Sequence, residues 1–132
     1  MSYLRWLGAY FLGLALIPAT PMLAWMSYPV VSRWVCPDFQ LRSGICMHPW
    51  FDLASTSVVY GIFALGSAAF VALPALLAPS ERRLVVNATF LIGAVLMAGI
   101  TLLSGFGALV FTAVTLASGT LTRLFLLRRL PQ

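Results

Sequence analysis

The chain has 132 residues, of which 61% are hydrophobic and only 8% are charged. A soluble domain of this size cannot present that much apolar surface to water without aggregating, so the composition excludes an ordinary water-soluble protein. The net charge is +5, and every basic residue is an arginine. Arginines beside membrane-spanning segments usually serve topology and contact with anionic lipid, so the charge does not indicate nucleic-acid binding.

Three stretches carry no charge, and they set the number of membrane crossings: 6–32, 53–80 and 84–122. A spanning helix needs about 20 apolar residues, so the third stretch is long enough for two crossings. Two glycines within residues 104–107 permit a tight turn between them. The first run is longer than a signal-peptide core, so we expect it to remain as a helix.

We therefore predict an all-α integral membrane protein, a single domain over residues 1–132 with four transmembrane helices in an antiparallel bundle. The helices are expected at about 4–30, 53–77, 85–103 and 108–127, with the last two joined by a very tight hairpin turn. The only sizeable loop is expected at residues 32–52.

The arginines indicate which helix ends face the cytoplasm. Arg82 and Arg83 precede the third uncharged stretch, and three more arginines follow it. Because positive residues are retained on the cytoplasmic side, both flanks share that side only if the stretch crosses twice. Arg5 joins them, whereas the charges of the loop at 32–52 sum to zero. Since arginine without lysine is typical of GC-rich bacterial genomes, we expect a bacterial inner-membrane protein with both termini cytoplasmic.

Cys36 and Cys46 lie in this outer loop, the one segment expected on an oxidising side of the membrane. A disulfide between them is predicted, and in the chain-entropy model it stabilises the folded loop by about 2 to 3 kcal/mol. Thiol exchange is the alternative, but that chemistry favours a closer Cys-x-x-Cys pair with an activated thiol. We interpret the pair as structural.

Several residues near the outer loop are candidates for binding a partner. Pro18 and Pro21 are expected to kink the outer part of the first helix, and lipid tolerates this where packed protein or water satisfies the freed carbonyls. A purely structural kink is the simpler account. In the loop the candidates are Trp34, Asp38, Arg42 and Trp50. The two tryptophans also suit an interfacial aromatic belt.

The last helix carries a stripe of hydroxyl groups at three- and four-residue steps, formed by Thr112, Thr115, Ser118 and Thr122. Residues at this spacing share one helix face, and small, weakly polar faces prefer protein to lipid. The stripe can pack on the third helix of the same chain or on a partner helix. We keep its four residues as further candidates for partner binding.

The spanning segments hold no Asp, Glu, Lys, Arg or His away from their ends. Proton relays and general acid–base pairs need such groups, so we expect that this chain alone is not an enzyme. A copper(I) site can be drawn from Met22, Met26 and the run 46–48, but apolar methionines and a surface His48 are the simpler interpretation. We therefore predict no metal site and no cofactor.

These observations predict a small inner-membrane protein that acts by binding another integral membrane protein. Two roles fit equally: an accessory or assembly subunit of a complex, and an immunity protein that blocks a membrane-acting toxin. The alternative is a small oligomeric transporter or channel without a coupled ion, in which the hydroxyl stripe lines the path. Membrane lipid is an expected partner in each case, and a homo-oligomer is compatible with each.

Overall fold

The structure, a computed structural model, describes residues 2–36, 41–42, 45–46, 48–78, 81–105 and 108–129. Its elements in chain order are α1 (Ser2–Val35), β1 (Leu41–Arg42), β2 (Ile45–Cys46), α2 (Phe51–Leu77), α3 (Arg82–Ser104) and α4 (Leu109–Arg129). All four helices are long and apolar enough to cross a membrane. The prediction of an all-helical chain with four long apolar helices is confirmed.

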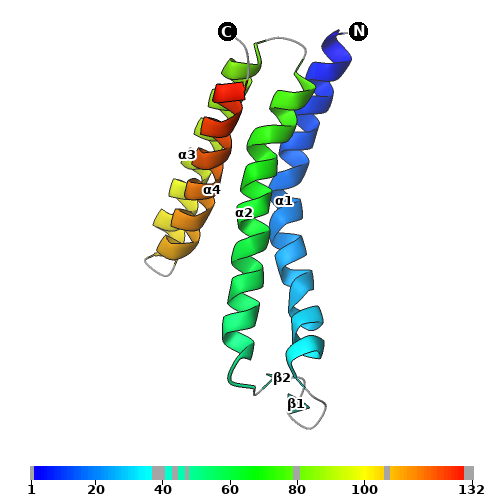
Figure 1. Cartoon of the computed structure of the whole chain (residues 1–132), viewed down its shortest axis with the longest axis vertical. Helices are drawn as coiled ribbons and strands as arrows, with labels where there is room; N and C mark the ends of the chain where they lie inside the picture. Colours follow the sequence, from blue (N-terminus) through cyan, green and yellow to red (C-terminus); the bar gives the residue numbers. More distant parts are fainter. Residues whose placement is uncertain are drawn as a thin grey trace.

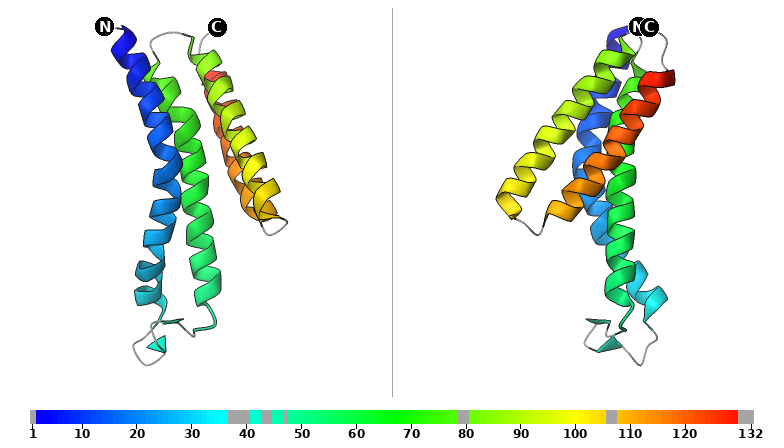
Figure 2. Two further views of the ribbon diagram at one scale, coloured as in Figure 1. Left: turned by 180° about the vertical axis from the view of Figure 1, so that it is seen from behind. Right: turned by 60° about the vertical axis from the view of Figure 1, so that its left-hand side comes forward.

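The helices run alternately up and down, and the first turn of α1 lies at the same end of the molecule as the last turn of α4 (Figure 1). We call this the terminal end, and we call the opposite end of α1 and α2 the disulfide end. Helix α2 contacts each of the other three helices, whereas α1 packs mainly on α2. Helix α4 contacts α2 as far as Phe111 near the tip of the α3–α4 hairpin, where the centre of the Phe111 ring lies 4.2 Å from the centre of the Phe63 ring of α2. Helix α3 packs on α2 near the terminal end and diverges from it toward the tip (Figure 2). The four helices therefore do not form a closed bundle.

The larger core cluster closes the terminal end of the fold. It consists of Val71, Ala75, Ala78, Val85 and Val86, with Phe90, Leu126 and Leu127 packed against it. Val86 is completely buried. Small side chains on the last turns of α2 allow α3 to approach its backbone closely, which is how helices associate where water supplies no driving force.

The smaller core cluster closes the disulfide end, between α1 and α2. It contains Val31, Cys36, Cys46 and Phe51. The Tyr28 ring stands edge-on to the Phe51 ring, with centroids 5.1 Å apart. Strands β1 and β2 pair antiparallel in the connection between α1 and α2. The predicted disulfide between Cys36 and Cys46 is confirmed, with Cα atoms 5.8 Å apart.

Helix α1 is longer than the sequence predicts. It continues to Val35 instead of ending at about residue 30, although Pro18, Pro21 and Pro29 lie inside it. The predicted kink is a bend within a continuous helix, visible as a change in the axis of α1 in Figure 1. The last turns persist because Val31 is buried against α2, and tertiary packing outweighs the donors that the prolines remove.

The remaining boundaries lie within a few residues of the prediction. Helices α2 and α3 begin earlier, at Phe51 and Arg82. Because α1 continues to Val35 and α2 begins at Phe51, the segment expected as a loop over 32–52 is helical at both ends. The turn between α3 and α4 begins at Gly105, whose φ of 75° falls in the left-handed region that glycine adopts without strain. Its N–H donates to the Thr101 carbonyl and ends α3.

Candidate functional site

The two hairpins differ in length at the disulfide end. Helix α1 has 34 residues and α2 has 27, whereas α3 and α4 have 23 and 21. At 1.5 Å per residue, α1 is about 50 Å long and α3 is about 35 Å long. The disulfide end of α1 and α2 therefore extends past the tip of the α3–α4 hairpin (Figure 1). We call this part, residues 22–36 with residues 48–57, the protruding hairpin.

Large apolar side chains cover the outside of the protruding hairpin. Trp34 is 88% exposed, Trp25 84% and Trp50 64%. Met22 and Met26 are exposed beside them. Large apolar side chains with this much exposure indicate contact with lipid or with another protein.

The base beneath these tryptophans is rigid. Cys36 and Cys46 are 4% and 8% exposed, so their disulfide lies inside the smaller core cluster instead of on the surface. Trp34 stands two residues before one cysteine of that pair. The backbone N–H of Trp50 donates to His48 Nδ1 at 3.3 Å, and the His48 carbonyl accepts from the Phe51 N–H at 3.0 Å. His48 thus holds the turn that precedes α2, a role that its sequence context did not reveal.

The structure places two of the four predicted loop candidates at helix ends and one in a strand, and the fourth lies outside the described residues. Trp34 lies in the last turn of α1 and Trp50 is the N-cap of α2, so both belong to helices and not to a loop. Arg42 lies in β1, paired with Ile45, and its side chain is outside the description. Asp38 lies outside the described residues.

The two candidate prolines of α1 lie farther from this end. Pro18 and Pro21 are both exposed. Pro21 lines a hollow of about 540 Å³ between α1 and α2, together with Trp25 and Tyr28. The bend of α1 thus opens space beside the exposed tryptophans, and α2 does not fill it.

The hydroxyl stripe of α4 is used inside the chain. Ser118 Oγ donates to the Ala64 carbonyl of α2 at 2.7 Å. The Thr115 carbonyl accepts from Ser67 Oγ, also of α2, at 2.8 Å. The Thr112 and Thr101 hydroxyls lie 2.5 Å apart and join α4 to α3.

The neighbour of the stripe is therefore mainly α2 and only partly α3, because α4 crosses the middle of α2. Thr122, the last member, donates to the Ser118 carbonyl of its own helix at 2.9 Å. These contacts leave Thr112, Thr115 and Ser118 on an internal face, so they do not offer a partner an open surface.

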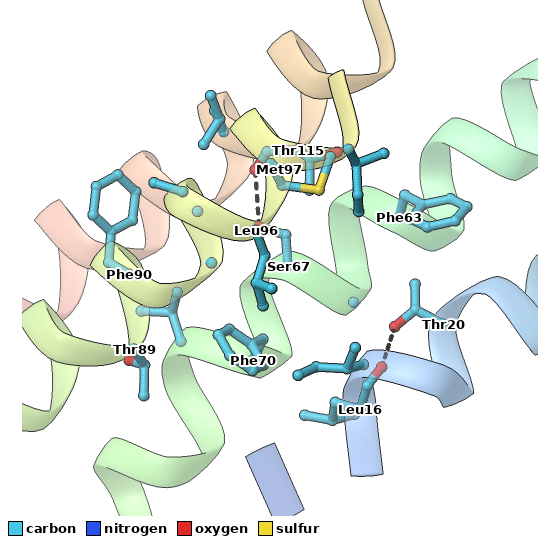
Figure 3. A pocket seen from close by; sticks show the side chains of 18 of the residues that line it. Leu16, Thr20, Phe63, Ser67, Phe70, Thr89, Phe90, Leu96, Met97 and Thr115 are labelled. Atoms are coloured by element: carbon cyan, nitrogen blue, oxygen red, sulfur yellow. Dashed lines mark hydrogen bonds between the residues drawn. The ribbon is translucent and has the colours of Figure 1, made fainter. Parts of the chain in front are cut away.

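A groove lies between the four helices at mid-height, with a volume of about 340 Å³. Figure 3 shows Leu16 of α1, Phe70 of α2 and Leu96 of α3 around the same space. Ile17, Leu96 and Ile100 line it and are 43–45% exposed, so the groove opens sideways between α1 and α3. Its lining comes from four helices at once, which no pattern in one segment signals.

Charge gathers at the terminal end. Arg123 Nε donates to Asn87 Oδ1 at 2.9 Å, and its guanidinium lies 5.1 Å from the centre of the Phe90 ring. Arg129 stacks similarly on Phe125. Within the described ranges, no three His, Cys, Asp or Glu side chains come together as a metal site would require.

Comparison with protein-family models, with curated proteins and with solved structures returns no match to this chain. What the protein does is therefore argued from its own geometry.

Proposed function

We propose that the chain is a bacterial inner-membrane protein that binds another integral membrane protein through the protruding hairpin, without catalysis of its own. Its termini face the cytoplasm. The charge distribution supports this orientation, because the terminal end carries six arginines against one acidic residue: Arg5, Arg82, Arg83, Arg123, Arg128 and Arg129 against Glu81. Positive residues are retained on that side during insertion.

The observation that carries the proposal is the extra length of α1 and α2 beyond the α3–α4 hairpin. The hydrocarbon core of a bilayer is about 30 Å thick, which matches α3 and α4 and falls short of α1 by roughly 20 Å. Trp25 has the position of an interfacial anchor, but Trp34 stands nine residues farther along α1. Trp34 is 88% exposed, and beyond the lipid its large apolar ring would face water. A protein partner that covers this ring removes that apolar surface from water and so gains binding free energy.

The rigidity of the protruding hairpin supports the same role. A partner that binds a preformed surface loses less free energy in ordering it, and the disulfide and the Val31 cluster have already ordered this one. An accessory or assembly subunit and an immunity protein both use such a surface. In either role the partner lies on the periplasmic face, where a membrane-acting toxin or a larger subunit is reachable.

The test is purification of the tagged protein from its native membrane in mild detergent, comparing the natural chain with a Trp34→Ala, Trp50→Ala variant. The natural chain is expected to recover one protein in stoichiometric amount, and the variant to recover at least tenfold less, as is usual for central aromatic contacts. The matched control is Leu102→Ala, Leu103→Ala, which removes similarly exposed side chains from the tip of α3. Equal recovery from both variants would contradict the proposal.

A further inference from the structure

The two tryptophans proposed to contact the partner depend on the same small set of buried residues. Trp34 lies in the last turn of α1, two residues before Cys36. Trp50 immediately precedes Phe51, the first residue of α2. Cys36 and Phe51 are buried together in the smaller core cluster. One cluster therefore positions both tryptophans.

The last turn of α1 has little support of its own. Pro29 has no backbone N–H, so one hydrogen bond of the helix is missing one turn before Trp34. Only residues 30–35 of the helix follow this proline, and a helix that short does not persist in isolation. The turn that carries Trp34 is therefore held by the burial of Val31 and Cys36 in the smaller core cluster.

The first turn of α2 is held by the same cluster. Trp50 is the N-cap of α2, and its side chain makes no capping hydrogen bond. Phe51 is buried in the cluster and packs edge-on against Tyr28 of α1. The chain has only two cysteines, so their disulfide is the one cross-link that holds these two helix ends together.

Reduction of the disulfide removes half of this arrangement. Two of the four buried residues of the cluster are the linked cysteines, and the restraint that the closed ring places on the open chain is lost. Helix ends with few buried contacts are the first parts of a protein to open locally. A surface that is ordered in about one tenth of the molecules binds its partner about ten times more weakly.

We propose that oxidation of Cys36 and Cys46 to the disulfide is the step that makes the protruding hairpin competent to bind its partner. The inference rests on the proposed function and adds the regulation of the same surface. A reduced chain carries the same tryptophans but does not hold them in place. Because a cytoplasmic segment stays reduced, partner binding is confined to chains whose outer segment has reached an oxidising compartment.

The oxidant is a protein or small molecule that itself carries a disulfide. The thiolate of one cysteine attacks a sulfur of that disulfide and forms a mixed disulfide, which the thiolate of the second cysteine then attacks. The bond between Cys36 and Cys46 forms, and the oxidant leaves as a dithiol. The two electrons and the two protons of the cysteine thiols pass to the oxidant.

Burial of the product makes this step one-way under native conditions. Cys36 and Cys46 are both buried, and thiol–disulfide exchange requires a thiolate to reach one of the two sulfurs. A thiol in solution reaches them only when the cluster opens. The bond therefore forms while the end of the hairpin is open, and it persists once the cluster has closed.

Reversible reduction of the tagged natural chain tests the proposal. Chain made in cells with dithiothreitol present throughout synthesis is extracted in mild detergent and freed of the reductant. One portion is kept reduced, a second is reoxidised with oxidised glutathione, and chain made without dithiothreitol is the third sample. Each is mixed with extract from untreated membranes of cells that lack the chain, so the partner itself is never reduced.

The reduced portion is expected to recover at least tenfold less partner than the other two samples. Equal recovery by the reduced and the never-reduced chain would overturn the proposal. A reoxidised chain that maleimide labelling shows to have no free thiol, but that does not regain binding, would overturn it as well.

The Cys36→Ser, Cys46→Ser variant, taken through the same treatments, is the matched control. It is expected to recover as little partner as the reduced natural chain in every sample. A gain on treatment with oxidised glutathione would place the response outside this disulfide and refute the inference. Failure of the never-reduced natural chain to recover any partner would instead refute the proposed function.

Discussion

The two helical hairpins of this chain are similar in composition and differ in length and in how they are held. The mean hydropathy of their spans lies between 1.6 and 2.1, with no consistent difference between the pairs. Helices α3 and α4 match one membrane crossing, whereas α1 and α2 exceed it. Apolar composition thus determines which segments suit lipid. Helix length determines which residues would extend beyond the hydrocarbon core.

The contacts that hold the two hairpins differ as well. The α3–α4 hairpin is attached to α2 by the larger core cluster and, in addition, by hydroxyl-to-carbonyl bonds at Ser67 and Ser118. The disulfide end of α1 and α2 is held by a buried disulfide and by Val31 and Phe51. In the proposed insertion, polar bonds suit the hairpin that stays within the membrane, and a covalent link suits the one that stands outside it. Each kind of contact can be removed separately.

The largest effect is expected from removing the disulfide with Cys36→Ser and Cys46→Ser. The free energy of unfolding should fall by about 2 to 3 kcal/mol, because the denatured loop is no longer restrained. Denaturant titration in detergent, followed by tryptophan fluorescence, measures it. The reduced natural protein should behave like the variant. An unchanged midpoint would show that the link does not stabilise the protruding hairpin.

A somewhat smaller effect is expected where α1 approaches α2. A Cβ at Gly66 would lie 2.6 Å from Thr20 Cγ2, whereas one at Gly61 would meet nothing within 4 Å. Gly66→Leu should therefore destabilise the protein by about 2 kcal/mol through overpacking. Gly61→Leu on the same helix is the control and should be close to neutral. Similar midpoints for the two variants would mean that α1 does not pack on α2 as described.

The attachment of the α3–α4 hairpin should respond more weakly. Ser118→Ala removes the bond to the Ala64 carbonyl. Interhelical hydrogen bonds in membranes are worth about 0.6 kcal/mol on average, and we expect a loss of that size in the same titration. Ser57→Ala removes a hydroxyl that bonds only within its own helix, to Leu53, and serves as the control. A loss from Ser57→Ala as large as that from Ser118→Ala would argue against the α2–α4 contact.

The smallest effect on stability is expected at the partner surface. Trp34→Ala should change the free energy of unfolding by less than about 0.5 kcal/mol, because the side chain is 88% exposed. The same variant should recover much less partner from the membrane. A large destabilisation would instead make Trp34 a packing residue of the chain.

Much of the fold follows from local signals. Uninterrupted apolar runs predict the four helices, and the glycine at position 105 predicts the tight turn between the last two. The disulfide was predictable because Cys36 and Cys46 are the only cysteines and share one segment. These features depend on residues close together in the sequence, so helix periodicity, turn propensity and cysteine spacing are enough to predict them.

The candidate site depends on contacts between distant segments and was predicted only in part. Trp34 and Trp50 were identified, but their place on helices follows from the burial of Val31 and Phe51 against each other's helices. The stripe at Ser118 was recognised, but its neighbour α2 was not, because a small, weakly polar helix face can pack on several other helices with similar energy. The groove has no signal within any one helix.

Site-specific photo-cross-linking in intact cells tests the central claim most directly, with p-benzoylphenylalanine placed at position 34 and, as the control, at position 103. Both positions are about 90% exposed, one on the protruding hairpin and one at the tip of α3. Position 34 is expected to give one discrete adduct with another membrane protein, and position 103 none. The same adduct from both positions, or adducts from position 34 only with further copies of this chain, would contradict the account.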